Sequence, residues 1–135
     1  MIYEVNGPIQ TKQQIEINGE VFTVDAGVGN FRGEYRKAKV DLLESFKRLQ
    51  KTINAEKAQA ELGTFMIALL KSVFGDTQAD RILDIYKEDY VYMLACLLPW
   101  FNDILEPMLN KMTEEKRETY KNYAKYGKHK RRWFK

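Results

Sequence analysis

The spacing of apolar residues changes once along this 135-residue chain, and that change limits the folds it can adopt. Up to Val24, apolar and polar residues alternate, which is typical of strands with one buried face. From Phe31 onward, apolar residues recur every three or four positions, which is typical of amphipathic helices. The sequence therefore predicts a short β element followed by an all-helical remainder.

The strand-like segment contains the dipeptide Asn18-Gly19, which is the strongest short signal for a two-residue hairpin turn. Such a turn pairs Ile17 with Glu20 and Ile15 with Phe22. An isolated two-stranded hairpin is only marginally stable, so its apolar face must pack on the rest of the protein. Four side chains share that face: Ile15, Ile17, Phe22 and Val24.

A third strand is expected at residues 2–5, which read Ile-Tyr-Glu-Val. The tripeptide Asn6-Gly7-Pro8 follows them and supplies a break between this segment and the hairpin.

Capping residues divide the first part of the helical region. Asn30 and Asn54 are candidate N-caps of two helices of about 20 residues each. Gly75 is expected to end the second of these helices, and Asp76 to cap a shorter third one.

A long apolar helix is expected from about residue 89 to residue 112. Pro99 and Pro107 should kink or split it, because a proline ring removes a hydrogen bond and clashes with the preceding turn. Thr113 is then expected to cap a last, polar helix that ends at Gly127. The predicted fold class is α+β and mostly α, with an N-terminal hairpin followed by a bundle of four to five helices. Residues 1–127 are expected to form one domain, and residues 128–135 a basic C-terminal tail.

The net charge of +3 conceals an uneven distribution. Residues 1–54 carry 8 basic and 7 acidic side chains, residues 55–112 carry 5 and 9, and residues 113–135 carry 9 and 3. A basic cluster of this kind is open to three interpretations, namely a nucleic-acid contact, a protein-interaction segment or a solvated chain end.

Residues with catalytic chemistry are scarce in this sequence. His129, the only histidine, lies within the basic tail, and Cys96, the only cysteine, is expected to be a small core residue on the apolar helix. One cysteine and one histidine cannot form a zinc site of the familiar kinds. The expectation is therefore a protein that is not an enzyme, with no catalytic residues, cofactor or metal.

Membrane insertion is not expected either. The longest apolar run, residues 93–101, is far shorter than the ~20 residues of a membrane span, and no signal peptide is visible.

Binding to other chains is the remaining expectation, because large aromatic residues occur in two places where they could meet a partner. Apart from the exposed edge of the hairpin, the candidates are on the apolar helix and in the basic tail. They are Tyr90, Tyr92, Trp100, Phe101, Lys128, Lys130, Arg131, Arg132, Trp133 and Phe134.

The layout as a whole resembles the tail assembly chaperones of long-tailed, siphovirus-type bacteriophages and of Gram-positive prophages. The resemblance is carried by the hairpin segment from Ile15 to Phe22, the helical remainder, the charged C-terminal region and the total length. It implies a non-catalytic protein that binds the tape-measure protein and helps to recruit the tail-tube protein. It also implies a location in the cytoplasm of the bacterial host and absence from the mature virion.

Association between copies of this chain is a further expectation, since a chaperone needs apolar surface that is available but shielded. Two alternatives remain open. The first is a nucleic-acid-binding module that uses the basic aromatic tail. The second is a structural head–tail protein of the phage particle.

Overall fold

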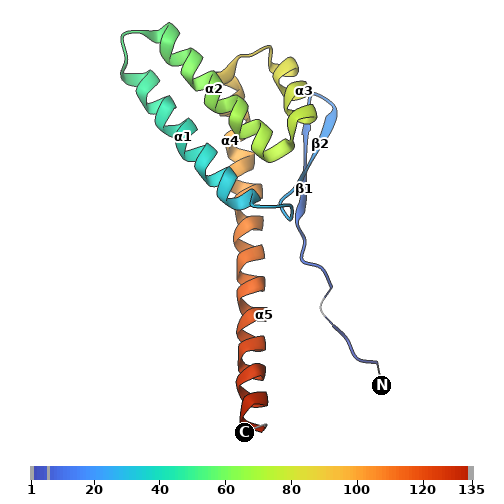
Figure 1. Cartoon of the computed structure of the whole chain (residues 1–135). Helices are drawn as coiled ribbons and strands as arrows, with labels where there is room; N and C mark the ends of the chain where they lie inside the picture. Colours follow the sequence, from blue (N-terminus) through green and yellow to red (C-terminus); the bar gives the residue numbers. More distant parts are fainter. Residues whose placement is uncertain (1, 6, 134–135) are drawn as a thin grey trace.

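A computed structural model describes residues 2–5 and 7–133 of the chain, with side chains up to Lys125. A hairpin and four helices form a body, and one long helix projects away from it (Figure 1). This α+β arrangement, mostly helical with an N-terminal hairpin, confirms the predicted fold class. The elements are β1 (Lys12–Ile17), β2 (Glu20–Asp25), α1 (Phe31–Lys51), α2 (Ala55–Phe74), α3 (Asp76–Tyr86), α4 (Tyr90–Trp100), a π-helical segment η1 (Phe101–Leu105) and α5 (Glu106–Trp133).

The hairpin has the predicted register. Ile17 pairs with Glu20, and Ile15 pairs with Phe22. Both turn residues between the strands have positive φ, 52° and 82°, as the two-residue turn requires. The predicted apolar face is also confirmed, because Ile17, Phe22 and Val24 are buried and Ile15 packs against the same core. Phe22 lies edge-on to Phe74 of α2, with 6.4 Å between the ring centroids.

The predicted third strand is wrong, because residues 2–5 do not form one. Ile2, Tyr3 and Val5 are 90%, 88% and 78% exposed. In Figure 1, the chain before Thr11 continues the direction of β1 instead of turning back beside it. No turn brings residues 2–5 back beside β1, so they have no strand to pair with there. Composition alone does not make a segment a strand.

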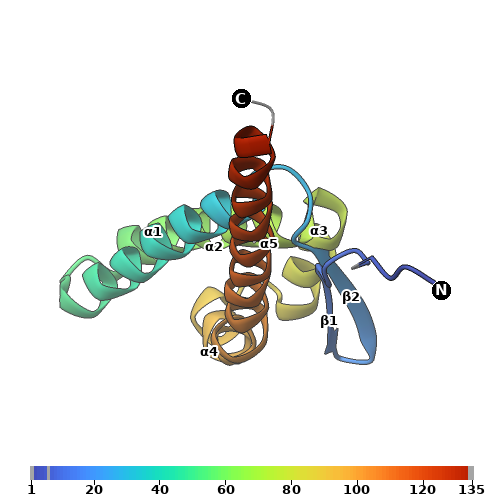
Figure 2. The same ribbon diagram turned by 90° about the horizontal axis from the view of Figure 1, so that it is seen from below.

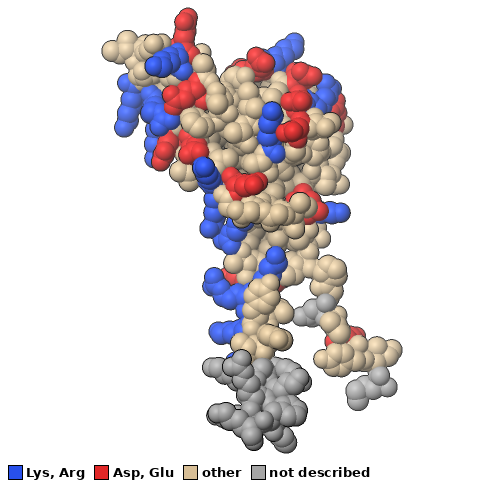
Figure 3. Space-filling view, viewed as in Figure 1, with Lys and Arg blue, Asp and Glu red and all other residues tan. Residues whose placement is uncertain are grey.

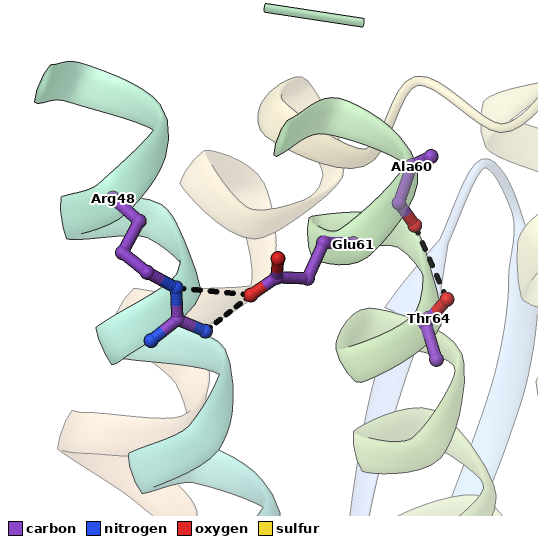
Figure 4. Close-up of polar contacts among 4 residues, drawn as sticks. All are labelled: Arg48, Ala60, Glu61 and Thr64. Atoms are coloured by element: carbon purple, nitrogen blue, oxygen red, sulfur yellow. Dashed lines mark hydrogen bonds and ion pairs between the residues drawn. The ribbon is translucent and has the colours of Figure 1, made fainter. Parts of the chain in front are cut away.

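Helices α1 and α2 lie side by side as an antiparallel pair (Figures 1 and 2). The Asn54 side chain accepts a hydrogen bond from the backbone N–H of Lys57 at 3.3 Å and so caps α2 as predicted. Asn30 precedes α1, but its side chain makes no capping hydrogen bond. Near the loop between the two helices, the Arg48 guanidinium holds Glu61, with 2.9 Å from Nε to Oε1 (Figure 4).

Figure 4 also shows Thr64 on α2, whose hydroxyl donates to the carbonyl of Ala60 at 3.2 Å. This bond stays within one helix, so it satisfies the hydroxyl without joining α2 to another element.

The core lies between the helices of the body and the buried face of the hairpin. It includes the apolar stripes of α1 and α2 and one face each of α3, α4 and early α5. Its largest fully buried side chains include Tyr35, Leu42, Leu62, Met66, Leu69 and Phe101.

The apolar helix contains two prolines but does not break at either of them. Pro99 lies within α4, and the five residues after the end of that helix form the π-helical segment η1. At its end the Glu106 N–H donates to the carbonyl of Phe101, five residues back. The wider π turn directly precedes Pro107, whose ring would otherwise press on the carbonyl four residues earlier. The helix therefore continues through the position where a split was predicted.

Two predicted helix boundaries are wrong. Thr113 does not cap a new helix, because it lies inside α5 and its hydroxyl donates to the carbonyl of Leu109 at 3.0 Å. Gly127 does not end the last helix, since α5 continues to Trp133. A helix that is already formed propagates at low cost, so one glycine does not stop it. In the described part of the chain, no helix combines the length and apolarity needed to cross a membrane.

Candidate partner-binding surfaces

The four aromatic residues predicted to bind a partner have different environments. Phe101 is fully buried, with its ring centroid 6.0 Å from that of Tyr35, so it belongs to the core and not to a surface. Trp100 is half-buried and stacks on Phe74 at 5.9 Å. When a helix is apolar on all sides, the neighbouring elements decide which of its faces is buried. Here the neighbouring elements cover Phe101.

Tyr90 is also held by the body. It is half-buried and lies against Gly63 of α2, where an added Cβ would come within 2.5 Å of the Tyr90 ring. Asp89 begins this turn of α4, and its side chain accepts a hydrogen bond from the Tyr92 N–H at 3.3 Å. Only Tyr92, at 61% exposed, remains a surface residue among the four.

Cys96 lies beside Tyr92 and is exposed, so its expected place in the core is wrong. Tyr92 packs edge-on against Tyr86 of α3 at 6.2 Å. A hydrogen bond with the Cys96 thiol raises the pKa of the Tyr92 hydroxyl, whereas burial is the main cause of the raised pKa of Tyr86. These three side chains form a small polar and aromatic patch between α3 and α4.

The basic C-terminal region is carried by α5, which leaves the body after Met112 (Figures 1 and 2). Every residue from 116 to 125 is exposed, including Tyr120 at 67% and Tyr123 at 75%. Lysine and arginine side chains follow one side of the projecting helix and continue over the body on that side (Figure 3). The backbone of α5 also includes five predicted binding residues whose side chains lie outside the described set: Lys128, Lys130, Arg131, Arg132 and Trp133. Phe134 lies outside the described residues altogether.

A polar cluster joins α1 to the π-helical segment. The Lys39 ammonium donates to Asn102 Oδ1 at 2.6 Å and to Glu106 Oε1 at 2.7 Å, and its side chain is only 14% exposed. The hydroxyl of Tyr35 is buried nearby without a hydrogen bond to any described residue. Burial raises the pKa of that hydroxyl, and the negative charge of Glu106 raises it further. The cluster holds two helices together and keeps Tyr35 neutral.

An apolar groove of about 360 Å³ separates the start of the hairpin from η1 and α5. Ile9 and Gln13 line one side, and Ile104, Pro107 and Met108 are among the residues on the other side. A second, more polar hollow continues from it along α5 as far as Asn122. Sequence reasoning did not identify this groove. Its only sequence signal was the apolar spacing of Met108 and Met112, which extends the core stripe to the last turn of the body.

Among the described residues, no group of three histidine, cysteine, aspartate or glutamate side chains is placed to hold a metal ion. Comparisons of the chain with protein-family models, curated proteins and solved structures find no match.

Proposed function

We propose that this chain is a tail assembly chaperone of a long-tailed bacteriophage or prophage. In this role it binds the tape-measure protein, assists assembly of the tail tube without catalysis, and acts in the cytoplasm of the bacterial host without remaining in the virion. Support comes from the sequence layout, namely a hairpin of this type, a helical body and a charged C-terminal region. The observation in the structure that carries the proposal is the projection of α5 beyond the body.

Most of the stability of a helix in a protein comes from packing of one face, so a projecting helix gains stability when a partner covers such a face. The buried stripe of α5 supplies such a face. Leu109 and Met112 are in the core, and Lys116, Tyr120 and Tyr123 follow them at helical spacing outside it. The face of α5 that packs on the body thus continues past it, and there it exposes Lys116 and then two tyrosines.

The chemistry of this exposed face favours a helical protein partner. Tyrosines are frequent anchors of protein interfaces, because they combine a large apolar ring with a polar tip. Lys116, Arg117 and Lys121 border the two tyrosines, so a partner helix with an apolar stripe and acidic flanks would fit.

Co-expression with the tape-measure protein of the same genome tests the proposal. We expect the tape-measure protein to be more soluble with this chain and to copurify with it. The double variant Tyr120→Ala/Tyr123→Ala should lose most of this effect, since it removes both exposed rings. Glu118→Ala is the matched control, because that residue is exposed on the opposite face of the same helix and alanine preserves the helix. No gain in solubility with the unaltered chain would overturn the proposal.

Nucleic-acid binding is a second candidate, favoured by the basic side chains along α5. Binding of this type depends steeply on salt, because it releases counterions from phosphates. If the candidate is correct, the chain should bind single- or double-stranded DNA or RNA at low salt, and removal of residues 127–135 should weaken that binding. Lack of binding at low salt would dismiss it.

A structural head–tail protein is distinguished by location. It would be present in purified phage particles, whereas an assembly chaperone would be absent from them.

A further inference from the structure

The two edges of the hairpin differ, because one of them is already occupied. On β2, the Gln78 side chain of α3 accepts a hydrogen bond from the Thr23 N–H at 3.0 Å and donates one to the Thr23 carbonyl at 2.8 Å. Arg81 of the same helix holds Glu20 in an ion pair. Helix α3 therefore occupies the edge of β2 at Thr23, where a further strand would otherwise bind.

The edge of β1 is open. Ile17 and Ile15 exchange backbone hydrogen bonds with β2. The backbone N–H and C=O groups of the alternate residues Lys12, Gln14 and Glu16 therefore point away from β2. The Lys12 carbonyl is taken by the Gln10 side chain at 2.7 Å. No hydrogen bond from another described residue reaches the outward backbone groups of Gln14 or Glu16. Unpaired groups of this kind are a template for a further strand.

The apolar groove described above adjoins this open edge. In Figure 2, β1 is the strand on the α5 side of the hairpin, and β2 lies beyond it. Strand β2 is bonded to Gln78 of α3. Gln13 of β1 lines the groove together with Ile104 and Met108 of the helical side. A strand added to β1 would thus have hydrogen-bonding groups along its backbone and an apolar hollow for alternate side chains.

The chain also contains a segment suited to this edge. Ile2–Val5 has the composition of a strand, yet its three large apolar side chains are almost fully exposed. Its own β1 is not within reach in the observed path, because the chain runs away from the hairpin (Figure 1). An unpaired strand-forming segment and an unpaired strand edge therefore occur on the same chain without meeting.

We propose that residues Ile2–Val5 of one copy add a strand to the β1 edge of a second copy, and that two copies exchange these segments reciprocally. Tyr3 and Val5 then face the groove, and Glu4 lies on the solvent side of the sheet. Because Lys12 attracts Glu4 and Glu16 repels it, the segment runs antiparallel to β1 with Glu4 beside Lys12 and Ile2 beside Gln14. The added strand displaces the Gln10 side chain from the Lys12 carbonyl. Reciprocal exchange produces a closed dimer with two identical strand additions.

Disulfide trapping between two differently tagged proteins tests this pairing. Both carry Cys96→Ser, one carries Glu4→Cys, and the other carries Lys12→Cys. We expect oxidation of the mixture to give a disulfide-linked heterodimer. Val28→Cys replaces Lys12→Cys in the control, because Val28 is exposed and lies outside the hairpin. A heterodimer yield no greater than in the control would overturn the proposal. So would a Glu4→Cys/Lys12→Cys protein that forms its disulfide within one chain.

Dimer dissociation, followed by light scattering or sedimentation, provides the second test. Val5→Asp should raise the dissociation constant at least about tenfold, because it places a charge in the apolar groove. Gln14→Pro should do the same by removing an outward N–H of the edge while sparing the hydrogen bonds to β2. Val28→Asp, a similar change at another exposed valine, should leave the constant unchanged. Equal dissociation of Val5→Asp and the unaltered chain would contradict the proposal, and neither test requires the tape-measure protein.

Discussion

At the residue scale, the aromatic side chains around α4 show how one helix divides neighbours between core and surface. Phe101 packs against Tyr35 and Trp100 with no exposed surface, whereas Tyr92, about two and a half turns earlier, is mostly in solvent. The sequence alone does not distinguish Tyr92 from Phe101, because both are aromatic residues of the same apolar segment. Their energetic roles should differ accordingly.

Phe101→Ala is expected to lower the free energy of unfolding by about 3–5 kcal/mol, because it leaves a cavity in the core. Tyr92→Ala should lower it by less than about 1 kcal/mol, since an exposed ring loses little on removal. Urea unfolding followed by circular dichroism measures both values. A similar loss for the two variants would contradict the assignment of Phe101 to the core and Tyr92 to the surface.

At the scale of elements, the π-helical segment determines how α4 passes into α5. Two prolines flank it, and Lys39 of α1 reaches across to Asn102 and Glu106, one within the segment and one directly after it. The Lys39 side chain is mostly buried, whereas Asn102 is exposed and the Glu106 side chain is 35% exposed, so the contact lies at the edge of the core. The contact holds α1 against the base of the projecting helix.

Lys39→Met should lower the free energy of unfolding by about 1–2 kcal/mol, because Asn102 and Glu106 lose their shared donor while the apolar stem is kept. Lys37→Met is the matched control, since Lys37 is exposed on the same helix and its replacement should change stability by less than about 0.5 kcal/mol. Thermal or urea unfolding of the two variants measures the difference. Equal stability would show that the Lys39 contact contributes nothing to the fold.

At the scale of the whole molecule, the body and the projecting part of α5 are energetically unequal. Met112 is the last buried side chain of the described residues, and those from 116 to 125 are exposed. Stability of the body should therefore come from residues before this point, while the projecting part is available to a partner.

A chain that ends at Glu118 should retain the free energy of unfolding of the full chain to within about 1 kcal/mol, because no buried contact is removed. Its helical circular dichroism signal should fall, and it should no longer copurify with the tape-measure protein if the proposed function is correct. A large loss of stability would instead show that the removed part of α5 packs against the body.

Local chemistry explains which features were predictable from the sequence. The Asn18-Gly19 turn determines the hairpin register, because a two-residue loop permits only one pairing of its flanking residues. Asn54 and Gly75 mark the ends of α2 for a similarly local reason, since capping depends on groups only a few residues apart. Neither feature required knowledge of what packs against it.

The tertiary structure alone decided the rest, because those features depend on contacts between distant segments. Residues 2–5 have the composition of a strand but do not pair with a strand among the described residues, and Cys96 lies on an exposed side of α4. Thr113 became an interior residue of α5, in contact with Arg32 of α1. The sequence determined turns, caps and the alternation of apolar residues. Packing determined which faces are buried, because burial depends on which distant segments meet.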